Sequence, residues 1–271
     1  MTIKTRNRLN LTLFVISICV FIFDAAFFVL KILKNDFDFS SFANYRIGNN
    51  ILTRYNPYVP ISAIFLQILY VICTSFLLFH IFEKTQASEI IYFHLFLVSC
   101  LIDSLRVWIP LFNVMDSYSN LLIFCGNSVV FAKILTPLSL FYTIFMSDTD
   151  KRQDTEKNVF ILFCIAFFFS QIIPLNTAIT QPNFSVDYSF KRTIKVASLV
   201  IMASCIIMLF VQNYKNRRSQ KTATGYLLLF IGISILFYST TILRFVTAVA
   251  SLSAGTALYL KGLHNQYLWN D

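Results

Sequence analysis

Seven long runs of apolar residues, separated by short polar segments, dominate the chain. The runs cover residues 9–33, 60–82, 90–112, 120–146, 159–179, 193–213 and 223–249. A helix needs about 20 apolar residues to cross the hydrocarbon core of a bilayer, because backbone amides cannot stay unpaired in lipid. The pattern therefore predicts an all-α fold, a multi-span transmembrane bundle of seven helices whose first partner is the lipid bilayer.

Composition supports a membrane protein and argues against a soluble one. Hydrophobic residues make up 57% of the 271 positions and charged residues only 13%, which leaves too little polar surface to cover a water-soluble globule. The formal net charge of +9 is typical of some nucleic-acid-binding proteins. Here the basic residues lie in short segments between the apolar runs, so we expect no nucleic-acid partner and attribute the charge to membrane topology.

The distribution of Lys and Arg predicts the orientation of the chain. Eleven lie in segments that share a side if the amino terminus is cytoplasmic, against six on the other side. Cytoplasmic segments carry the excess of basic residues, so we expect the amino terminus inside and, after seven spans, the carboxyl terminus outside. Residues 1–59 then form an uncleaved helix resembling a signal anchor, followed by an outer loop, and residues 60–271 form the main bundle.

One sequon agrees with this orientation. Asn183-Phe184-Ser185 matches the N-glycosylation pattern and falls in a segment that the charge bias places outside. The sequence thus predicts a glycoprotein modified at Asn183.

Signatures of membrane enzymes and metal proteins are absent from the sequence. The three histidines have no paired spacing, and neither a G-x-S-x-G elbow nor a glycine-rich phosphate loop occurs among six glycines. The six cysteines all fall within apolar runs and none has C-x-x-C spacing, so they are interpreted as small buried hydrophobes. We therefore expect no enzyme activity, no metal and no cofactor.

Three ionisable residues lie deep inside predicted spans, where a charge in lipid is costly. Asp103 and Arg106 are three residues apart on one predicted helix, and Lys133 lies near the middle of the next. One interpretation is that the three groups neutralise one another and specify helix packing. The other is that Arg106 or Lys133 is the counter-ion of an acidic ligand.

A ligand pocket on the outer side would gather further residues. Arg244, near the outer end of the last span, would join the pocket mouth, although snorkelling to the lipid headgroups explains its position equally well. Aromatic residues near the outer ends of the spans could line an entrance: Tyr118, Phe124, Tyr188 and Phe190. The candidate ligand-binding set is therefore Asp103, Arg106, Lys133 and Arg244.

From Tyr55 onward the sequence resembles the nematode serpentine receptors, and among them the class gamma (Srg-like) chemoreceptors. The resemblance rests on Pro60-Ile61…Gln67-Ile68-Leu69-Tyr70, then a short loop, then Tyr92-Phe93…Asp103-Ser104-Leu105. Residues Leu135-Thr136-Pro137-Leu138-Ser139-Leu140-Phe141-Tyr142 look like the end of the family's third helix. The resemblance implies a bundle like that of a G-protein-coupled receptor, with an extra first helix and without the family's usual last one.

Two features depart from the broader receptor pattern. The stretch Ser139-Leu140-Phe141-Tyr142-Thr143 lacks the Arg that such receptors carry at the cytoplasmic end of the third helix. Cys125 stands where many of them form a disulfide to an outer loop, but residues 180–192 contain no Cys.

The resemblance implies a plasma-membrane chemoreceptor that binds a small molecule from outside and signals through a heterotrimeric G protein. Basic cytoplasmic segments at 148–158 and 214–222 would face the G protein. Two alternatives remain open: a small transporter or channel subunit with Asp103, Arg106 and Lys133 along a polar path, and a diverged receptor fragment that does not signal.

Overall fold

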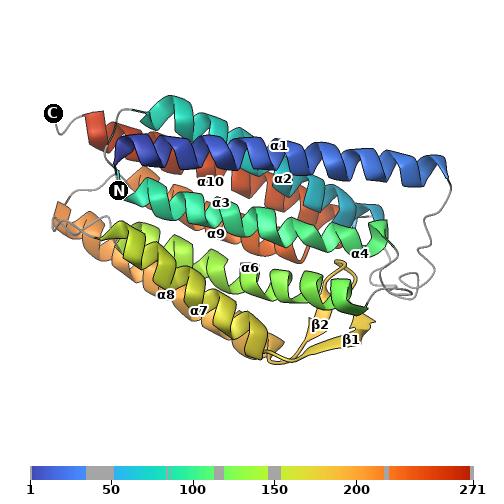
Figure 1. Ribbon diagram of the computed structural model, residues 1–271. Helices are drawn as coiled ribbons and strands as arrows, with labels where there is room; N and C mark the ends of the chain where they lie inside the picture. The colour runs from blue at the N-terminus through green and yellow to red at the C-terminus, as the bar shows by residue number, and fades with distance from the viewer. Residues whose placement is uncertain are drawn as a thin grey trace.

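A computed structural model describes residues 2–34, 52–83, 85, 87–112, 119–145, 154–216 and 220–268. The elements, in chain order, are α1 (Ile3–Leu33), α2 (Tyr58–Phe82), α3 (Glu89–Asp103), the 3₁₀ turn η2 (Ser104–Val107), α4 (Trp108–Leu111), α6 (Ser119–Phe145), α7 (Thr155–Ile172), β1 (Leu175–Thr180), β2 (Val186–Tyr188), α8 (Lys191–Asn216), α9 (Gln220–Phe237) and α10 (Ile242–Leu268). The long helices run roughly along one axis, and the hairpin of β1 and β2 lies at the end where α9 turns into α10 (Figure 1). The predicted all-α bundle is confirmed.

Seven of the helices in the described residues are long and apolar enough to cross a membrane, and Lys221–Phe237 is a shorter apolar helix. Large apolar side chains remain exposed on the outer helices, including Ile22 on α1, Phe168 on α7 and Ile207 on α8. Contiguous apolar surface of this extent is incompatible with water and fits lipid chains. The chain is an integral membrane protein.

The first helix is anchored to the bundle by polar contacts along its length. Asn10 donates to the Ser75 carbonyl (3.0 Å), and the Trp108 indole donates to Asp24 (2.9 Å). At its start, Arg6 donates to the Phe82 carbonyl at the end of α2. These contacts fix the depth and rotation of α1 against α2 and α4.

The fifth predicted span, 159–179, is wrong in its last third, residues 173–179. Helix α7 ends at Ile172, because Pro174 forces the preceding residue away from the helical region, and Ile173 has an extended ψ of 117°. Leu175–Thr180 then pairs antiparallel with Val186–Tyr188 as a hairpin. The prediction missed this hairpin because the residues of its first strand continue the apolar run, and those of its second strand were assigned to a loop.

The hairpin loop closes one end of the bundle. Phe184 at its tip is fully buried against Ile61 and Ile64 of α2 and against Val107 and Leu111. Its positive φ of 62° turns the loop inward so that the ring can reach this cluster. The hairpin is therefore packed as part of the bundle.

The last predicted span, 223–249, is two helices. Helix α9 ends at Phe237 and α10 begins at Ile242, with a turn in which the Ser239 hydroxyl donates to the Leu236 carbonyl. Thr241 caps α10 by accepting from the Arg244 amide (3.4 Å). The expectation that no helix follows this region is also wrong, since α10 extends to Leu268.

Glycines allow α9 and α10 to pack backbone to backbone. A Cβ on Gly232 would lie 2.7 Å from the Leu252 nitrogen, and one on Gly255 would lie 2.8 Å from the Gly225 carbonyl oxygen. Close approach through small residues is a common way to join helices in lipid, where no hydrophobic force draws them together.

The turn between α9 and α10 corrects the topology. Both termini lie at the end of the bundle opposite the hairpin (Figure 1), so the prediction that they face opposite sides is wrong. Lys261 then lies on the same side as the amino terminus. That side now has twelve basic residues instead of eleven, and the opposite side has five instead of six. The revised tally strengthens the assignment of this end to the cytoplasm and of the hairpin end to the outside.

Epitope tags at the two termini test this arrangement. We expect antibodies to reach both tags only after the cells are permeabilised, because an even number of crossings returns the chain to the cytoplasm. A tag inserted after Arg54, which is exposed in the segment before α2 on the side of the α9–α10 turn, should stain intact cells and serves as the control for the outer side. Staining of either terminal tag in intact cells would contradict the eight-helix topology.

Candidate functional site

Lys133 is buried in the middle of α6 without a carboxylate partner among the described residues. Its side chain is 5% exposed, and Nζ lies 3.4 Å from the Tyr188 hydroxyl. The amine also lies over two aromatic rings, 4.9 Å from the centroid of Tyr188 and 4.8 Å from that of Tyr238. Cation–π attraction of this kind offsets only part of the cost of burying a charge.

The two tyrosines supply no negative charge. Tyr188 ends strand β2 and Tyr238 begins the turn after α9, and burial raises the pKa of both phenols from the ordinary value. The phenols are therefore neutral at physiological pH and provide dipoles and π faces to Lys133.

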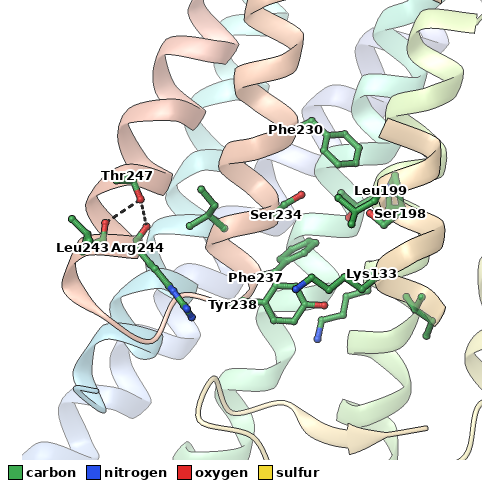
Figure 2. A pocket seen from close by; sticks show the side chains of 15 residues that line it. Lys133, Ser198, Leu199, Phe230, Ser234, Phe237, Tyr238, Leu243, Arg244 and Thr247 are labelled. Carbon is green, nitrogen blue, oxygen red and sulfur yellow. Dashed lines mark hydrogen bonds between the residues drawn. The ribbon is translucent and has the colours of Figure 1, made fainter. Parts of the chain in front are cut away.

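A cavity of about 520 Å³ opens beside Lys133, between α6, α8, α9 and α10. Its volume falls within the range of small-molecule sites. Figure 2 shows Lys133 and Tyr238 directed toward each other on one side, with Arg244 on the start of α10 across from them. The deeper wall is lined by Phe230 and Ser234 of α9.

Two further cations line the same cavity. Lys195 of α8 and Arg244 of α10 are exposed toward its opening, and within the described part of the chain neither forms an ion pair. Lys133 and Arg244, both predicted ligand residues, thus share one cavity. None of the described residues that line it is Asp or Glu.

Asp103 and Arg106, the other predicted ligand residues, lie elsewhere. They form a buried ion pair (3.3 Å) with side chains 0% and 1% exposed, and they line neither this cavity nor a second one beside α7. Arg106 also donates to the Phe237 carbonyl at the end of α9 (2.9 Å). The predicted pairing of these two residues is therefore present in the structure, whereas an ion pair of either residue with Lys133 is absent from the described contacts.

The predicted glycosylation of Asn183 does not fit this geometry. The side chain is 3% exposed, and Nδ2 donates to the Phe237 carbonyl (2.9 Å), the same oxygen that Arg106 contacts. Ser185 donates to Asn183 Oδ1 (2.8 Å). A glycan on Nδ2 would have to occupy the interior of the bundle.

Replacement of Asn183 tests this correction. We expect treatment with peptide N-glycosidase F to leave the electrophoretic mobility unchanged, both for the wild-type chain and for Asn183→Gln. Loss of the buried hydrogen bonds should lower the free energy of unfolding of Asn183→Ala by about 1–3 kcal/mol. A mobility shift of the wild-type chain alone would show that this asparagine carries a glycan.

The aromatic residues predicted to line an entrance lie in different places. Tyr188 contacts Lys133, and Phe190 lines the second cavity, whereas Phe124 is exposed on α6 and lines neither cavity. Tyr118 lies outside the described residues. Tyr238 was not predicted as a site residue, because the sequence placed it inside a span. The turn that brings its ring to Lys133 has no hydropathy signal.

No metal or disulfide chemistry is found in the described chain. It contains no group of three His, Cys, Asp or Glu side chains that could hold a metal ion. Cys125 is a free, buried thiol.

Comparisons with known proteins add no relative: no family model, no curated protein and no solved structure matches this chain.

Proposed function

We propose that this chain is a chemoreceptor-like protein of the plasma membrane, which binds a small molecule in the cavity beside Lys133 and signals through a heterotrimeric G protein. The observation that carries the proposal is a buried amine without a carboxylate partner at the wall of a cavity of ligand size. Burial of a protonated amine costs several kcal/mol unless a partner compensates it. A residue kept at such a cost inside a membrane bundle is a candidate binding group.

The turn after α9 offers a route from the cavity to the rest of the bundle. Tyr238 faces Lys133, and the preceding carbonyl of Phe237 accepts hydrogen bonds from Arg106 and Asn183. A ligand that displaces Tyr238 would strain these bonds and move the end of α9. Because α9 and α10 pack closely, the movement would extend to their cytoplasmic ends.

The cytoplasmic surface expected to bind the G protein comprises 148–158 and 214–222. Residues 148–153 and 217–219 lie outside the described chain, so the coupling rests on the basic sequence of these segments and on the resemblance to the serpentine receptors. Arg106 shares the Phe237 carbonyl with Asn183 of the hairpin loop, so it lies at the hairpin end and cannot substitute for the Arg missing from residues 139–143.

A cell-based response assay tests the function. We expect cells that express the chain with a panel of G-protein α subunits to respond to members of a small-molecule library. Lys133→Met should abolish the response at unchanged surface expression, measured by biotinylation of a tagged chain. Lys261→Gln, which removes an exposed cation at the cytoplasmic end of α10, is the matched control and should respond normally.

Two results would contradict the proposal. A response that persists when 148–158 and 214–222 are replaced by neutral linkers would refute the coupling. Ligand flux into vesicles that hold only the purified chain would favour the transporter or channel instead.

A further inference from the structure

The charge balance of the main cavity restricts what it can bind. Three cations line it, Lys133, Lys195 and Arg244, with no acid among its described lining residues. The nearest buried acid, Asp103, is paired with Arg106. A cationic ligand would meet uncompensated like charge, whereas an anion would supply the missing partner.

A second cavity meets the first at Lys133. It has a volume of about 440 Å³, lies between α6, α7 and α8, and shares Lys133, Pro137, Ile194 and Ser198 with the first cavity. Apart from Lys133 and two hydroxyl side chains, its described lining is aliphatic and aromatic. The second cavity is therefore an apolar compartment directly beside the amine of Lys133.

We propose, on the premise that the proposed small-molecule function holds, that the ligand is a single-chain amphiphile with a carboxylate head. The carboxylate accepts from Lys133 Nζ, beside the hydroxyls of Tyr188 and Tyr238. The alkyl chain occupies the second cavity, against Ile165 and Phe169 of α7. The exposed side chains of Arg244 and Lys195 attract the anion to the opening of the first cavity, and they stay exposed when it binds.

The size of the second cavity favours one chain over two. A volume of this order is that of a small-molecule site, and a phospholipid with two acyl chains and a glycerol headgroup exceeds it. The carboxylate on one chain also matches the single buried amine, because a charge-assisted hydrogen bond is stronger than a neutral one.

Equilibrium binding to the full chain in phosphatidylcholine nanodiscs tests the ligand class. The probe is radiolabelled dodecanoate, competed by unlabelled dodecanoate, dodecanol, dodecyltrimethylammonium, acetate or phosphatidylglycerol. We expect dodecanoate to bind saturably and about tenfold more tightly than dodecanol, with no competition by the other three. Lys133→Met should weaken dodecanoate by about tenfold and leave dodecanol unchanged.

Two more variants keep the test decisive if Lys133→Met does not fold. Arg244→Gln changes an exposed side chain and should weaken dodecanoate in the same direction by a smaller factor. Ala197→Phe narrows the second cavity and should weaken dodecanoate while sparing hexanoate. Lys261→Gln is again the control and should bind like the wild type.

Each contrary result has one meaning. Equal binding of dodecanol and dodecanoate, unchanged by Lys133→Met, overturns the carboxylate class but leaves a small-molecule site intact. Competition by phosphatidylglycerol overturns the single-chain assignment in favour of a bilayer lipid. Absence of binding by every probe overturns the ligand class, while the response assay with Lys133→Met judges the proposed function separately.

Discussion

Asp103→Leu is expected to lower the free energy of unfolding by about 3–5 kcal/mol, because it leaves the guanidinium of Arg106 buried without its counter-charge. Both side chains are essentially inaccessible, and among the described residues the other hydrogen bond of Arg106 is to the Phe237 carbonyl. Loss of the pair should therefore also loosen the end of α9. Thermal unfolding of the purified chain in nanodiscs, followed by tryptophan fluorescence, would show a lower midpoint.

The double variant Asp103→Leu/Arg106→Met is the matched control. Replacing a buried ion pair by apolar residues of similar size is often neutral, so we expect this variant to unfold much closer to the wild type than Asp103→Leu does. Double-mutant analysis then gives the coupling of the pair. If both variants unfold at the same midpoint, the ion pair contributes nothing and Arg106 is held by the Phe237 carbonyl alone.

The sequence could predict this pair but not that Lys133 forms no ion pair with Asp103 among the described contacts. Asp103 and Arg106 are three residues apart, and 3₁₀ geometry in η2 still keeps them on one face. Lys133 was expected to reach Asp103 because their depths were similar. Its amine instead lies near Tyr188, on the second strand of a hairpin whose first strand hydropathy could not separate from α7.

The extra helix had a sequence signal of a different kind. Residues 223–249 read as one span because Ser239, Thr240 and Thr241 are too few and too weakly polar to break the hydropathy run. Glycines, however, recur seven residues apart on each side, at 225 and 232 and again at 255 and 262. Small residues at helical spacing predict a close helix pair, and two such sets around a polar turn predict a helical hairpin.

Gly255→Leu is expected to disrupt that hairpin and to cost about 3 kcal/mol, the upper part of the range for overpacking. Even the first side-chain atom would lie 2.8 Å from the Gly225 carbonyl oxygen and 2.9 Å from the Leu228 carbonyl carbon. These atoms are backbone and cannot move aside without separating α9 from α10. Size-exclusion chromatography of a fluorescent fusion should show loss of the monodisperse peak, or a lower midpoint in the fraction that remains.

Ala254→Leu is the control for this variant. Ala254 is the preceding residue on α10 and is exposed, so a leucine side chain at this position lies outside the contact with α9. We expect its unfolding midpoint to stay within the range of the wild type, since surface substitutions usually change stability by less than about 0.5 kcal/mol. Equal behaviour of Gly255→Leu and Ala254→Leu would mean that α9 and α10 do not pack through their glycines. The turn that brings Tyr238 to Lys133 would then lose its structural basis, and the route from the cavity to the cytoplasmic ends would have to be sought outside this helix pair.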